Sequence, residues 1–391
     1  MKILLINTGY LSIPPKSSGP YAGGSIELHV YQLASELAKL GAEVYCVTNV
    51  TEGNPFFEGK VIIYEPKNLS LESQSYVGNL AIFAIKGILT SMEAAKVIIK
   101  QRFDIVHGHG NISLSFLPFL GKTKTVFTVH NRTPWMLPSF SFKQVIRKLT
   151  FIMLDYNIMK RVNSIIAVSG NLKEELVNRW KIPIEKITII PNGVDLERFR
   201  PKIPDSASKI SKYGINSDYA LFVGRLVEEK GVHRIIEAIP GTDLHVVIIG
   251  DGPLLPFLRS LSVKFGVDKQ VHFLGTIPRS ELPNFYSQAT LFILPSLAEG
   301  TPLAGLEAAA SGLPLVVSSS SGMDSAVING YNGFVVDEVD EIREKMTLLF
   351  RDESLRRIMG ERSRKIAEEN FSWKTVAQRT LQLYEKVLHA S

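Results

Sequence analysis

Two cations and two carboxylates stand where runs of β-branched residues end. Arg225 closes the run ALFVGR, and Lys230 follows it in GRLVEEKG. Glu299 follows the run TLFILP, and Glu307 comes later in the same stretch, SLAEGTPLAGLEAAASG. An arginine fork and a lysine can pair with a diphosphate, and carboxylates accept hydrogen bonds from hydroxyl groups. These residues therefore predict a site for a ligand that carries both phosphates and hydroxyls.

The segment between the two glutamates predicts the start of a helix. The turn Gly300-Thr301-Pro302 suits that role, because proline loses no hydrogen bond in the first helical turn. We expect the helix to run from about Leu303 to Ser311. Its N–H groups and positive dipole end would offer an anion site, and its small side chains would let it pack closely on a sheet or a ligand.

The same residues also fit ordinary structural roles. Arg225 and Lys230 would then lie in a solvated loop with Glu228 and Glu229 as partners. The two glutamates of the later stretch would be a loop carboxylate and a solvated helix residue. Because one glutamate precedes the helix and the other lies inside it, separate tasks fit them better than an acid–base pair. The residues alone leave both explanations open.

Histidines mark the ends of two other predicted strands. His107 and His109 alternate in DIVHGH, and His130 ends TVFTVH. No aspartate, glutamate or cysteine stands near HGHG at metal-ligand spacing, so the sequence predicts no metal site. We expect His130 to contact substrate, although a structural role fits it too. The loop after the first strand ends in Gly23-Gly24-Ser25, which offers N–H groups to an anion.

These positions depend on strands that alternate with helices. The predicted strands of the first half are KILLIN (2–7), EVYCVT (43–48), VIIYE (61–65), DIVHGH (104–109), KTVFTVH (124–130), SIIAVS (164–169) and KITIIPN (186–192). Those of the second half are ALFVGR (220–225), LHVVIIG (244–250), VHFLG (271–275), TLFILP (290–295), LVVSS (315–319) and GFVVD (333–337). Such apolar strands imply parallel sheets covered on both faces, which bind ligands beyond their carboxyl ends.

The alternation predicts two α/β domains. At 391 residues the chain is too long for one core. The breaker-rich stretch RFRPKIPDSASK (198–209) predicts a linker. We place one domain at residues 1–200 and the other at 201–372, followed by a C-terminal helix over 373–391. Two such sheets in tandem suggest that a ligand binds in a cleft between the domains.

Composition excludes several classes of protein. Hydrophobic residues make up 45% and charged residues 21% of the chain, as in soluble globular proteins. The single cysteine, Cys46, excludes an internal disulfide, and its apolar neighbours predict a buried, inert thiol. The sequence shows no signal-peptide pattern and no apolar run long enough to span a bilayer, so we expect a cytoplasmic protein.

The net charge of +6 favours an anionic partner. The basic residues are scattered and do not interleave with aromatic motifs, which disfavours nucleic acid. Residues 134–161 combine large apolar side chains with lysines and arginines. An amphipathic helix on the acidic face of a membrane would show that pattern, and so would a buried helix with basic ends, which is the interpretation we favour.

Taken as a set, several motifs resemble those of family 4 of the retaining, nucleotide-sugar-dependent glycosyltransferases. They are GGSIELHVYQLASELAKLGAEV, TVH, IIPNGVDLERFRP, FVGRLVEEKG, GDGP, FLGTIPRSELPNFYSQATLFILPSLAEG, GLEAAASGLPLVVSSSSG and NGYNGFVV. The resemblance runs nearly end to end. It implies an α/β GT-B fold, with an acceptor-binding and a donor-binding Rossmann-like domain facing a central cleft. It also implies that the final helix packs back on the first domain.

The resemblance implies roles for the residues above. Arg225 and Lys230 would hold the donor diphosphate, Glu299 the hydroxyls of the donor sugar, and Glu307 the ribose. Backbone groups of Gly300, Thr301 and Leu303 would approach the phosphates; Pro302, where the family commonly has glycine, removes one donor. His130 would lie near the anomeric carbon and the acceptor, and we assign Gly23, Gly24 and His109 to the acceptor side or the phosphate loop.

The expected activity is transfer of a hexose from a nucleoside diphosphate sugar to a hydroxyl acceptor, such as a glycan, glycolipid or small molecule, with retention of configuration. We expect neither a metal nor another cofactor, since two cations and a helix end can stabilise the departing diphosphate. Two alternatives stay open: a two-domain sugar-binding protein without chemistry, and a GT-B phosphorylase or nucleotide-sugar epimerase.

Overall fold

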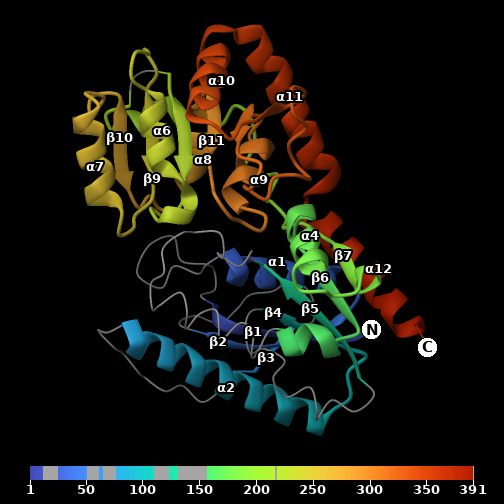
Figure 1. Cartoon of the computed structure of the whole chain (residues 1–391). Coiled ribbons are helices and arrows are strands. Elements are labelled where there is room, and N and C mark those ends of the chain that lie inside the picture. The colour runs from blue at the N-terminus through green and yellow to red at the C-terminus, as the bar shows by residue number, and fades with distance from the viewer. Residues whose placement is uncertain are drawn as a thin grey trace. The chain divides into compact units, whose positions relative to one another are not determined.

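The computed structural model describes residues 1–11, 25–50, 61–64, 76–109, 123–130, 156–215 and 218–390. The chain divides into two compact units, whose elements are labelled in Figure 1. Unit 1 contains Met1–Val168, Leu172–Ile190 and Val376–Ser391. Unit 2 contains Ser169–Asn171 and Pro191–Thr375.

Unit 1 is built on a seven-stranded parallel sheet in the order β3-β2-β1-β4-β5-β6-β7. The strands are β1 (Lys2–Leu11), β2 (Glu43–Val50), β3 (Val61–Tyr64), β4 (Ile105–His109), β5 (Lys124–Val129), β6 (Ser164–Ala167) and β7 (Ile187–Ile189). Its helices include α1 (Ser25–Lys39), α2 (Tyr76–Lys100), α4 (Gly170–Asn178) and most of α12 (Trp373–His389). Every strand expected in this half of the chain is confirmed.

Unit 2 repeats this plan with a six-stranded parallel sheet, ordered β10-β9-β8-β11-β12-β13. The strands are β8 (Ala220–Val223), β9 (Val246–Ile249), β10 (Val271–Gly275), β11 (Leu291–Leu294), β12 (Leu315–Val317) and β13 (Gly333–Val335). The helices are α5 (Ser206–Ser211), α6 (Val232–Ala238), α7 (Leu255–Lys264), α8 (Leu282–Gln288), α9 (Leu303–Ala310), α10 (Val339–Arg351) and α11 (Glu353–Asn370). All six expected strands are present.

Both sheets have the strand order of a Rossmann fold, in which the chain reverses direction across the sheet after its third strand. The reversal leaves a topological switch point between β1 and β4 in unit 1 and between β8 and β11 in unit 2. All residues of β4, β9 and β11 are buried, as expected of strands covered on both faces. Ligands bind such sheets beyond the carboxyl ends of the strands at the switch point.

The stretch at residues 198–209 is more ordered than a linker. Helix α5 begins within it, and Phe199 is 1% exposed. The Phe199 ring meets the Tyr286 ring edge-on, with 5.5 Å between centroids. The expectation of a linker is wrong for this part, because aromatic packing against a distant helix orders a segment whose own composition favours irregular structure.

The segment that precedes it is anchored within unit 2. The Val194 amide donates to the Phe371 carbonyl at 2.7 Å, and Val194 forms a parallel bridge with Ser372. A Cβ on Gly193 would lie 2.4 Å from the Trp373 ring, so glycine is required there. The main stretch of unit 2 therefore begins at Pro191 and ends at Thr375.

Most of α12 belongs to unit 1, from Val376 onward. The Tyr384 hydroxyl lies 2.6 Å from Nδ1 of His107, and Lys124 Nζ donates to the Ala390 carbonyl at 2.7 Å. Tyr384 is fully buried. Hydrogen bonds thus join the C-terminal helix to β4, which carries the histidines of HGHG, and join the residue after it to the start of β5.

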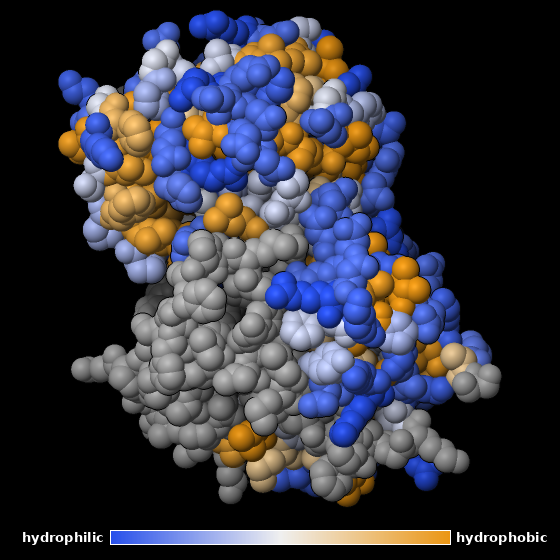
Figure 2. All heavy atoms as spheres, in the orientation of Figure 1, coloured by the Kyte–Doolittle hydropathy of each residue, from blue (hydrophilic) through white to orange (hydrophobic). Residues whose placement is uncertain are grey.

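The surface of the described residues is mixed. Figure 2 shows polar side chains over much of the visible face, with apolar ones in separate groups. Among the described helices, none is long and apolar enough to cross a membrane.

Candidate functional site

At the switch point of unit 2, the loop that carries the predicted cations meets the loop that carries the predicted carboxylate Glu299. Strands β8 and β11 are neighbours, with Ala220 paired to Leu291 in register. The loop after β8 touches the loop after β11, since the Leu297 amide donates to the Glu229 carbonyl at 2.8 Å. Gly231 has φ +62°, and a Cβ there would lie 2.2 Å from the Pro295 carbonyl. Only glycine allows this approach.

Lys230 and Glu299 meet at this point. Nζ of Lys230 lies 2.5 Å from Oε2 of Glu299, and the side chains are 16% and 12% exposed. The Ser296 hydroxyl donates to the other carboxylate oxygen, and the Glu299 amide donates to the Ser320 carbonyl at 3.2 Å. The partner of Lys230 is therefore Glu299, and the local glutamates of GRLVEEKG do not take that role. Arg225 is exposed in the same loop.

Helix α9 begins directly after this pair. Thr301 is 4% exposed, and its carbonyl accepts a hydrogen bond from Asn192 Nδ2 at 2.6 Å. Pro302 is the N-cap residue, with φ −71° and ψ 125°, and within the described residues no side chain caps this end. The first N–H groups of an uncapped helix need a partner and favour an anion.

The small side chains of α9 are needed for packing. Seven of its residues are buried, among them Gly305 and Glu307. A Cβ on Gly305 would lie 2.5 Å from Sδ of Met323. On the loop after β12, Gly322 has φ +71° and passes so close to the Gly300 carbonyl that any Cβ would clash. These contacts fix Gly300–Leu303 at the tip of β11.

Glu307 occupies a separate polar site inside unit 2. It is 3% exposed, and one of its oxygens forms an ion pair with Arg279. The other oxygen accepts a hydrogen bond from the Tyr286 hydroxyl at 3.1 Å. Burial first, and then the Glu307 charge, raise the pKa of Tyr286. The structure thus gives Glu299 and Glu307 different partners, which agrees with separate tasks.

Arg279 and Tyr286 were not singled out in the sequence. Both lie in PRSELPNFY, after β10, and they are far along the chain from Glu307. The signal that could have found them is an arginine and aromatic residues in a segment directly after a predicted strand. The pairing itself could not be predicted, because it depends on how α8 packs beside α9.

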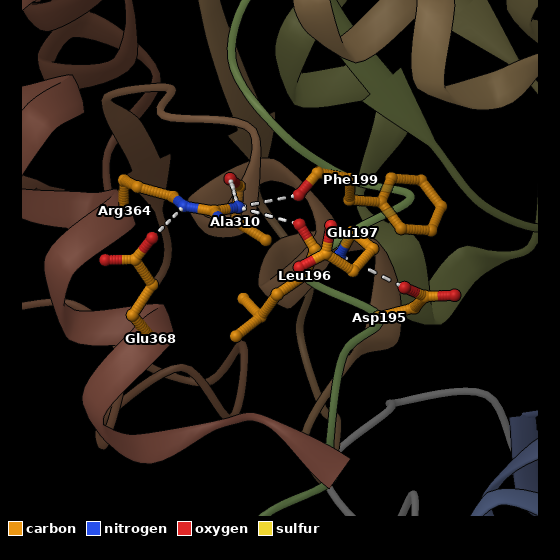
Figure 3. A network of polar contacts seen from close by, with 7 residues as sticks. All are labelled: Asp195, Leu196, Glu197, Phe199, Ala310, Arg364 and Glu368. Carbon is orange, nitrogen blue, oxygen red and sulfur yellow. Dashed lines mark hydrogen bonds and ion pairs between the residues drawn. The ribbon is translucent and has the colours of Figure 1, made fainter.

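A second arginine fixes the other end of α9 (Figure 3). Arg364, on α11, lies within hydrogen-bond distance of three backbone carbonyls through Nη1: Ala310 at 2.7 Å, Phe199 at 2.8 Å and Leu196 at 3.1 Å. Its Nε donates to Glu368 at 2.6 Å. A cation at the C-terminal end of a helix is favourable because the last carbonyls carry negative partial charge. Arg364 therefore ties α9 to the segment that carries Phe199.

In unit 1, the predicted histidines gather beside the switch point. His107 and His109 lie on one face of β4, with 4.1 Å between ring centroids. Nε2 of His107 lies 2.7 Å from the Thr128 hydroxyl, and Nδ1 of His109 lies 3.2 Å from Nε2 of His130. Burial, followed by the neighbouring imidazoles, holds the pKa of His107, His109 and His130 well below the usual range. These side chains are therefore neutral at physiological pH.

A fourth histidine completes this group. His29, on α1, is 3% exposed, and its ring centroid lies 4.8 Å from that of His130 and 5.4 Å from that of His109. Among the described residues, His29, His109 and His130 offer ligand atoms that all lie within 4.8 Å of one another. The prediction of no metal rested on HGHG alone and did not include His29.

Some predicted residues lie outside the described part of the chain. Gly23 and Gly24 are among them, and so is most of the segment 134–161. The described end of that segment, 156–161, is helical, with Ile158 and Met159 buried and Lys160 and Arg161 exposed. Cys46 is 3% exposed, and burial raises its pKa to about 12, as expected for an inert thiol.

Comparison with known proteins places this geometry in context. Residues 205–366 match the family described as glycosyl transferases group 1, and residues 23–198 match glycosyltransferase family 4. An Escherichia coli protein named UDP-Gal:alpha-D-GlcNAc-diphosphoundecaprenol alpha-1,3-galactosyltransferase is 32% identical over 72% of this chain and 75% of its own length. The gpi3 subunit of the phosphatidylinositol N-acetylglucosaminyltransferase of Schizosaccharomyces pombe is 26% identical over 93% of this chain and 78% of its own.

Solved structures resemble the whole chain. Sucrose-phosphate synthase from Thermosynechococcus elongatus has a TM-score of 0.78 and 21% identity, with all of both chains covered. Anabaena HepE in complex with UDP and glucose has a TM-score of 0.71 and 19% identity, covering 99% of this chain and 100% of its own. At these identities the likeness concerns the fold.

Proposed function

Because this chain belongs to glycosyltransferase family 4, whose members use nucleotide-sugar donors, we propose that it transfers a hexose to a hydroxyl acceptor with retention of the anomeric configuration. The fold is GT-B, with two Rossmann-like domains. The observation that carries the proposal is the meeting of Lys230 and Glu299 at the switch point of unit 2, directly before the uncapped end of α9.

The donor diphosphate is assigned to this switch point. Lys230 and Arg225 supply positive charge, and the N–H groups around Thr301 and Leu303 supply hydrogen bonds. A nucleoside diphosphate leaves with about three negative charges, and preorganised cations and a helix end stabilise such a charge as it develops. Lys230 pairs with Glu299, and the pair holds both groups in place at the end of the sheet.

The two carboxylates are assigned to different parts of the donor. Glu299 accepts hydrogen bonds from hydroxyls of the sugar, and Glu307 accepts them from the ribose. Glu307 already accepts from Arg279 and Tyr286, and each carboxylate oxygen has a second lone pair for a ribose hydroxyl. Because their partners already hold the two carboxylates in place, donor binding costs less side-chain conformational entropy.

The acceptor is assigned to unit 1. His130 and His109 lie at the carboxyl ends of β5 and β4, and the proposed role of His130 is contact with the transferred sugar and the acceptor. We extend the proposal to Gly23 and Gly24 on the acceptor side. Two relatives are named for lipid-linked acceptors, one a diphosphoundecaprenol saccharide and the other phosphatidylinositol. A glycolipid acceptor at the cytoplasmic face of a membrane, approached with the segment 134–161, is the acceptor class we favour.

The proposed chemistry takes place on one face of the donor sugar and needs no metal. The bond between the anomeric carbon and the phosphate oxygen breaks, and a new bond forms between that carbon and the acceptor oxygen. The proton of the acceptor hydroxyl passes to the departing phosphate oxygen. Lys230, Arg225 and the N-terminus of α9 stabilise the charge that grows on the diphosphate, and that charge is largest in the transition state.

A ligand panel tests the donor assignment. Thermal unfolding is measured with UDP, GDP, ADP and their sugar conjugates, and we expect one base to raise Tm, with UDP favoured by the named relative. The stabilising donor is then incubated with lipid-linked and soluble acceptors, and the anomeric configuration of the product is determined by NMR. Inversion of configuration would contradict the retaining mechanism.

Controls separate the alternatives. Conversion of the donor sugar without any acceptor would identify an epimerase, and cleavage that requires orthophosphate would identify a phosphorylase. Stabilisation by free sugars with no response to any nucleotide would identify a sugar-binding protein. Each of these results would replace the proposed transfer reaction.

A further inference from the structure

We propose that His29, His109 and His130 bind a transition-metal ion of the Zn²⁺ class, and that the bound ion inhibits sugar transfer. The three residues come from three elements of unit 1: helix α1, the end of β4, and the position after β5. They are 3%, 0% and 8% exposed. The inhibitory part rests on the proposed function, whereas the binding part stands on the geometry alone.

Two of the three imidazoles already have the spacing of ligands that share an ion. Zn²⁺ binds histidine nitrogens at about 2.0–2.1 Å with tetrahedral geometry, which places two such nitrogens about 3.3 Å apart. Nδ1 of His109 and Nε2 of His130 lie 3.2 Å apart. The ligand atoms of all three residues lie within 4.8 Å of one another, so small side-chain rotations bring the third nitrogen into place.

The donor set selects the kind of ion. Imidazole suits Zn²⁺, Cu²⁺, Ni²⁺ and Co²⁺, whereas Mg²⁺ and Ca²⁺ prefer oxygen ligands. The group that the structure brings together consists of histidines only. Three histidines leave one tetrahedral position for water or another ligand, the arrangement of an open zinc site.

Neighbouring groups fix the rings without competing for the ion. Both ring nitrogens of His107 are engaged, one with Tyr384 and the other with Thr128. Its ring lies beside that of His109, with 4.1 Å between centroids and 38° between the ring planes. Within the described residues, Nε2 of His109 is buried and has no hydrogen-bond partner. A buried nitrogen without a partner is costly, and this cost is separate from the ion, which the other ring nitrogen, Nδ1, would hold.

Inhibition follows from the use of His130. A nitrogen that coordinates an ion cannot also contact the donor sugar or the acceptor, so the occupied site lowers turnover. The donor-binding residues are in unit 2 and do not include these histidines, so the ion leaves nucleotide binding unchanged. Zinc would then be a reversible inhibitor that competes with the acceptor and the donor sugar for His130. Its effect would appear in turnover and not in the affinity for the nucleotide.

Binding is tested on the full chain after removal of metals with a chelator. Titration with Co²⁺ should produce the visible absorption of a tetrahedral complex at one ion per chain, and Zn²⁺ should displace it. His29→Gln and His109→Gln should bind Co²⁺ at least about 100-fold more weakly than the wild type, because loss of a ligand should cost more than loss of a group that only supports a ligand. The matched control is His272→Gln, which removes a histidine from a pair with His245 in unit 2. Their nitrogens lie 3.3 Å apart, and among the described residues this pair is not part of a group of three possible ligands.

The outcomes are distinct. No tetrahedral Co²⁺ spectrum, or equal affinity in His29→Gln and the wild type, would overturn the site. With the site shown, Zn²⁺ should inhibit transfer by the wild type at least tenfold, a chelator should restore it, and Mg²⁺ should have no effect. Full activity of the zinc-loaded protein would overturn the inhibitory role. A chain that binds Co²⁺ but is not stabilised by any nucleotide sugar would instead refute the proposed function and leave the metal site in place.

Discussion

The switch points of the two units use opposite electrostatic strategies. Unit 2 holds charged pairs, Lys230 with Glu299 at the switch point and Arg279 with Glu307 farther along α9. In unit 1 the polar side chains near the sheet are neutral imidazoles, whose pKa burial holds well below the usual range. The same fold therefore holds one site suited to charge and another suited to uncharged groups.

This difference corresponds to the two substrates of the proposed reaction. A departing diphosphate carries negative charge, and fixed cations lower its free energy in the transition state. A hydroxyl acceptor carries none, and a neutral imidazole can accept or donate a hydrogen bond without adding net charge to a buried site. Four predictions test this contrast.

The largest effect is expected from Lys230→Ala. Removing a preorganised charge from a developing anion typically costs about 10²–10³-fold in kcat, and we expect a loss in that range. Steady-state kinetics with the donor identified by thermal shift would measure it. Lys212→Ala is the control, since Lys212 forms an ion pair with Glu281 but its side chain is 57% exposed. Equal kinetics in the two variants would show that the charge of Lys230 does not stabilise the departing diphosphate.

A second prediction concerns the support of α9. Arg364→Met leaves the carbonyls of Leu196, Phe199 and Ala310 without their shared donor. Buried acceptors that lose a partner cost about 1–3 kcal/mol, so we expect a loss of about 2–3 kcal/mol in the free energy of unfolding and weaker donor binding. Calorimetry and nucleotide titration measure the two effects.

Arg357→Met is the matched control for Arg364. It lies on the same helix and forms an i,i+4 pair with Glu361, but the two side chains are 66% and 64% exposed. Exposed pairs contribute about 0.3–0.5 kcal/mol, so this variant should behave almost as the wild type. If it lost as much stability as Arg364→Met, the carbonyl network would not be the cause.

The third prediction uses Cys46 to test how strongly unit 1 excludes charge. Burial raises the pKa of this thiol from 9.0 to about 12, so the unfolded chain loses its proton at a lower pH than the folded chain. Above pH 9 the unfolded chain loses this proton while the folded chain keeps it, so the free energy of unfolding should fall by about 1 kcal/mol between pH 9 and 10. Urea unfolding of the wild type and Cys46→Ala between pH 9 and 10 measures the difference in slope.

Tyrosines of the unfolded chain also begin to titrate in this window, but they are the same in both proteins, so the difference in slope reports the thiol. The thiol should also resist alkylation in the folded protein and react once the chain unfolds. Identical slopes in the wild type and Cys46→Ala would show that the interior of unit 1 tolerates a charge at this position.

The sequence predicted the sheets well and the side-chain pairs poorly. Apolar runs between turn residues mark parallel strands, and an arginine or glutamate directly after such a run lies at a strand tip whatever the details of packing. Arg225, Lys230 and Glu299 could therefore be placed beyond strand ends from the sequence alone. The partners of Glu307 were not, because Arg279 and Tyr286 reach it only once α8 packs beside α9.

His29 illustrates the same limit in unit 1. In the sequence it is one polar residue on an amphipathic helix, far from HGHG and TVH. The structure places α1 so that its ring contacts those of His109 and His130. Phe199 was missed for a similar reason, since prolines and polar residues around it predicted a linker where aromatic packing orders the chain.

The smallest effect is expected from removing metals. If Lys230, Arg225 and the N-terminus of α9 together stabilise the diphosphate, EDTA should leave kcat unchanged, and added Mg²⁺ should not raise it. Assays in chelated buffer with and without Mg²⁺ measure this. Loss of activity that Mg²⁺ restores would mean that the charges of unit 2 do not suffice and that an oxygen-coordinated cation shares their task. A modest gain on chelation, absent in His29→Gln, would instead reveal a zinc-class ion leaving the histidines of unit 1, and would leave the charge-based role of unit 2 intact.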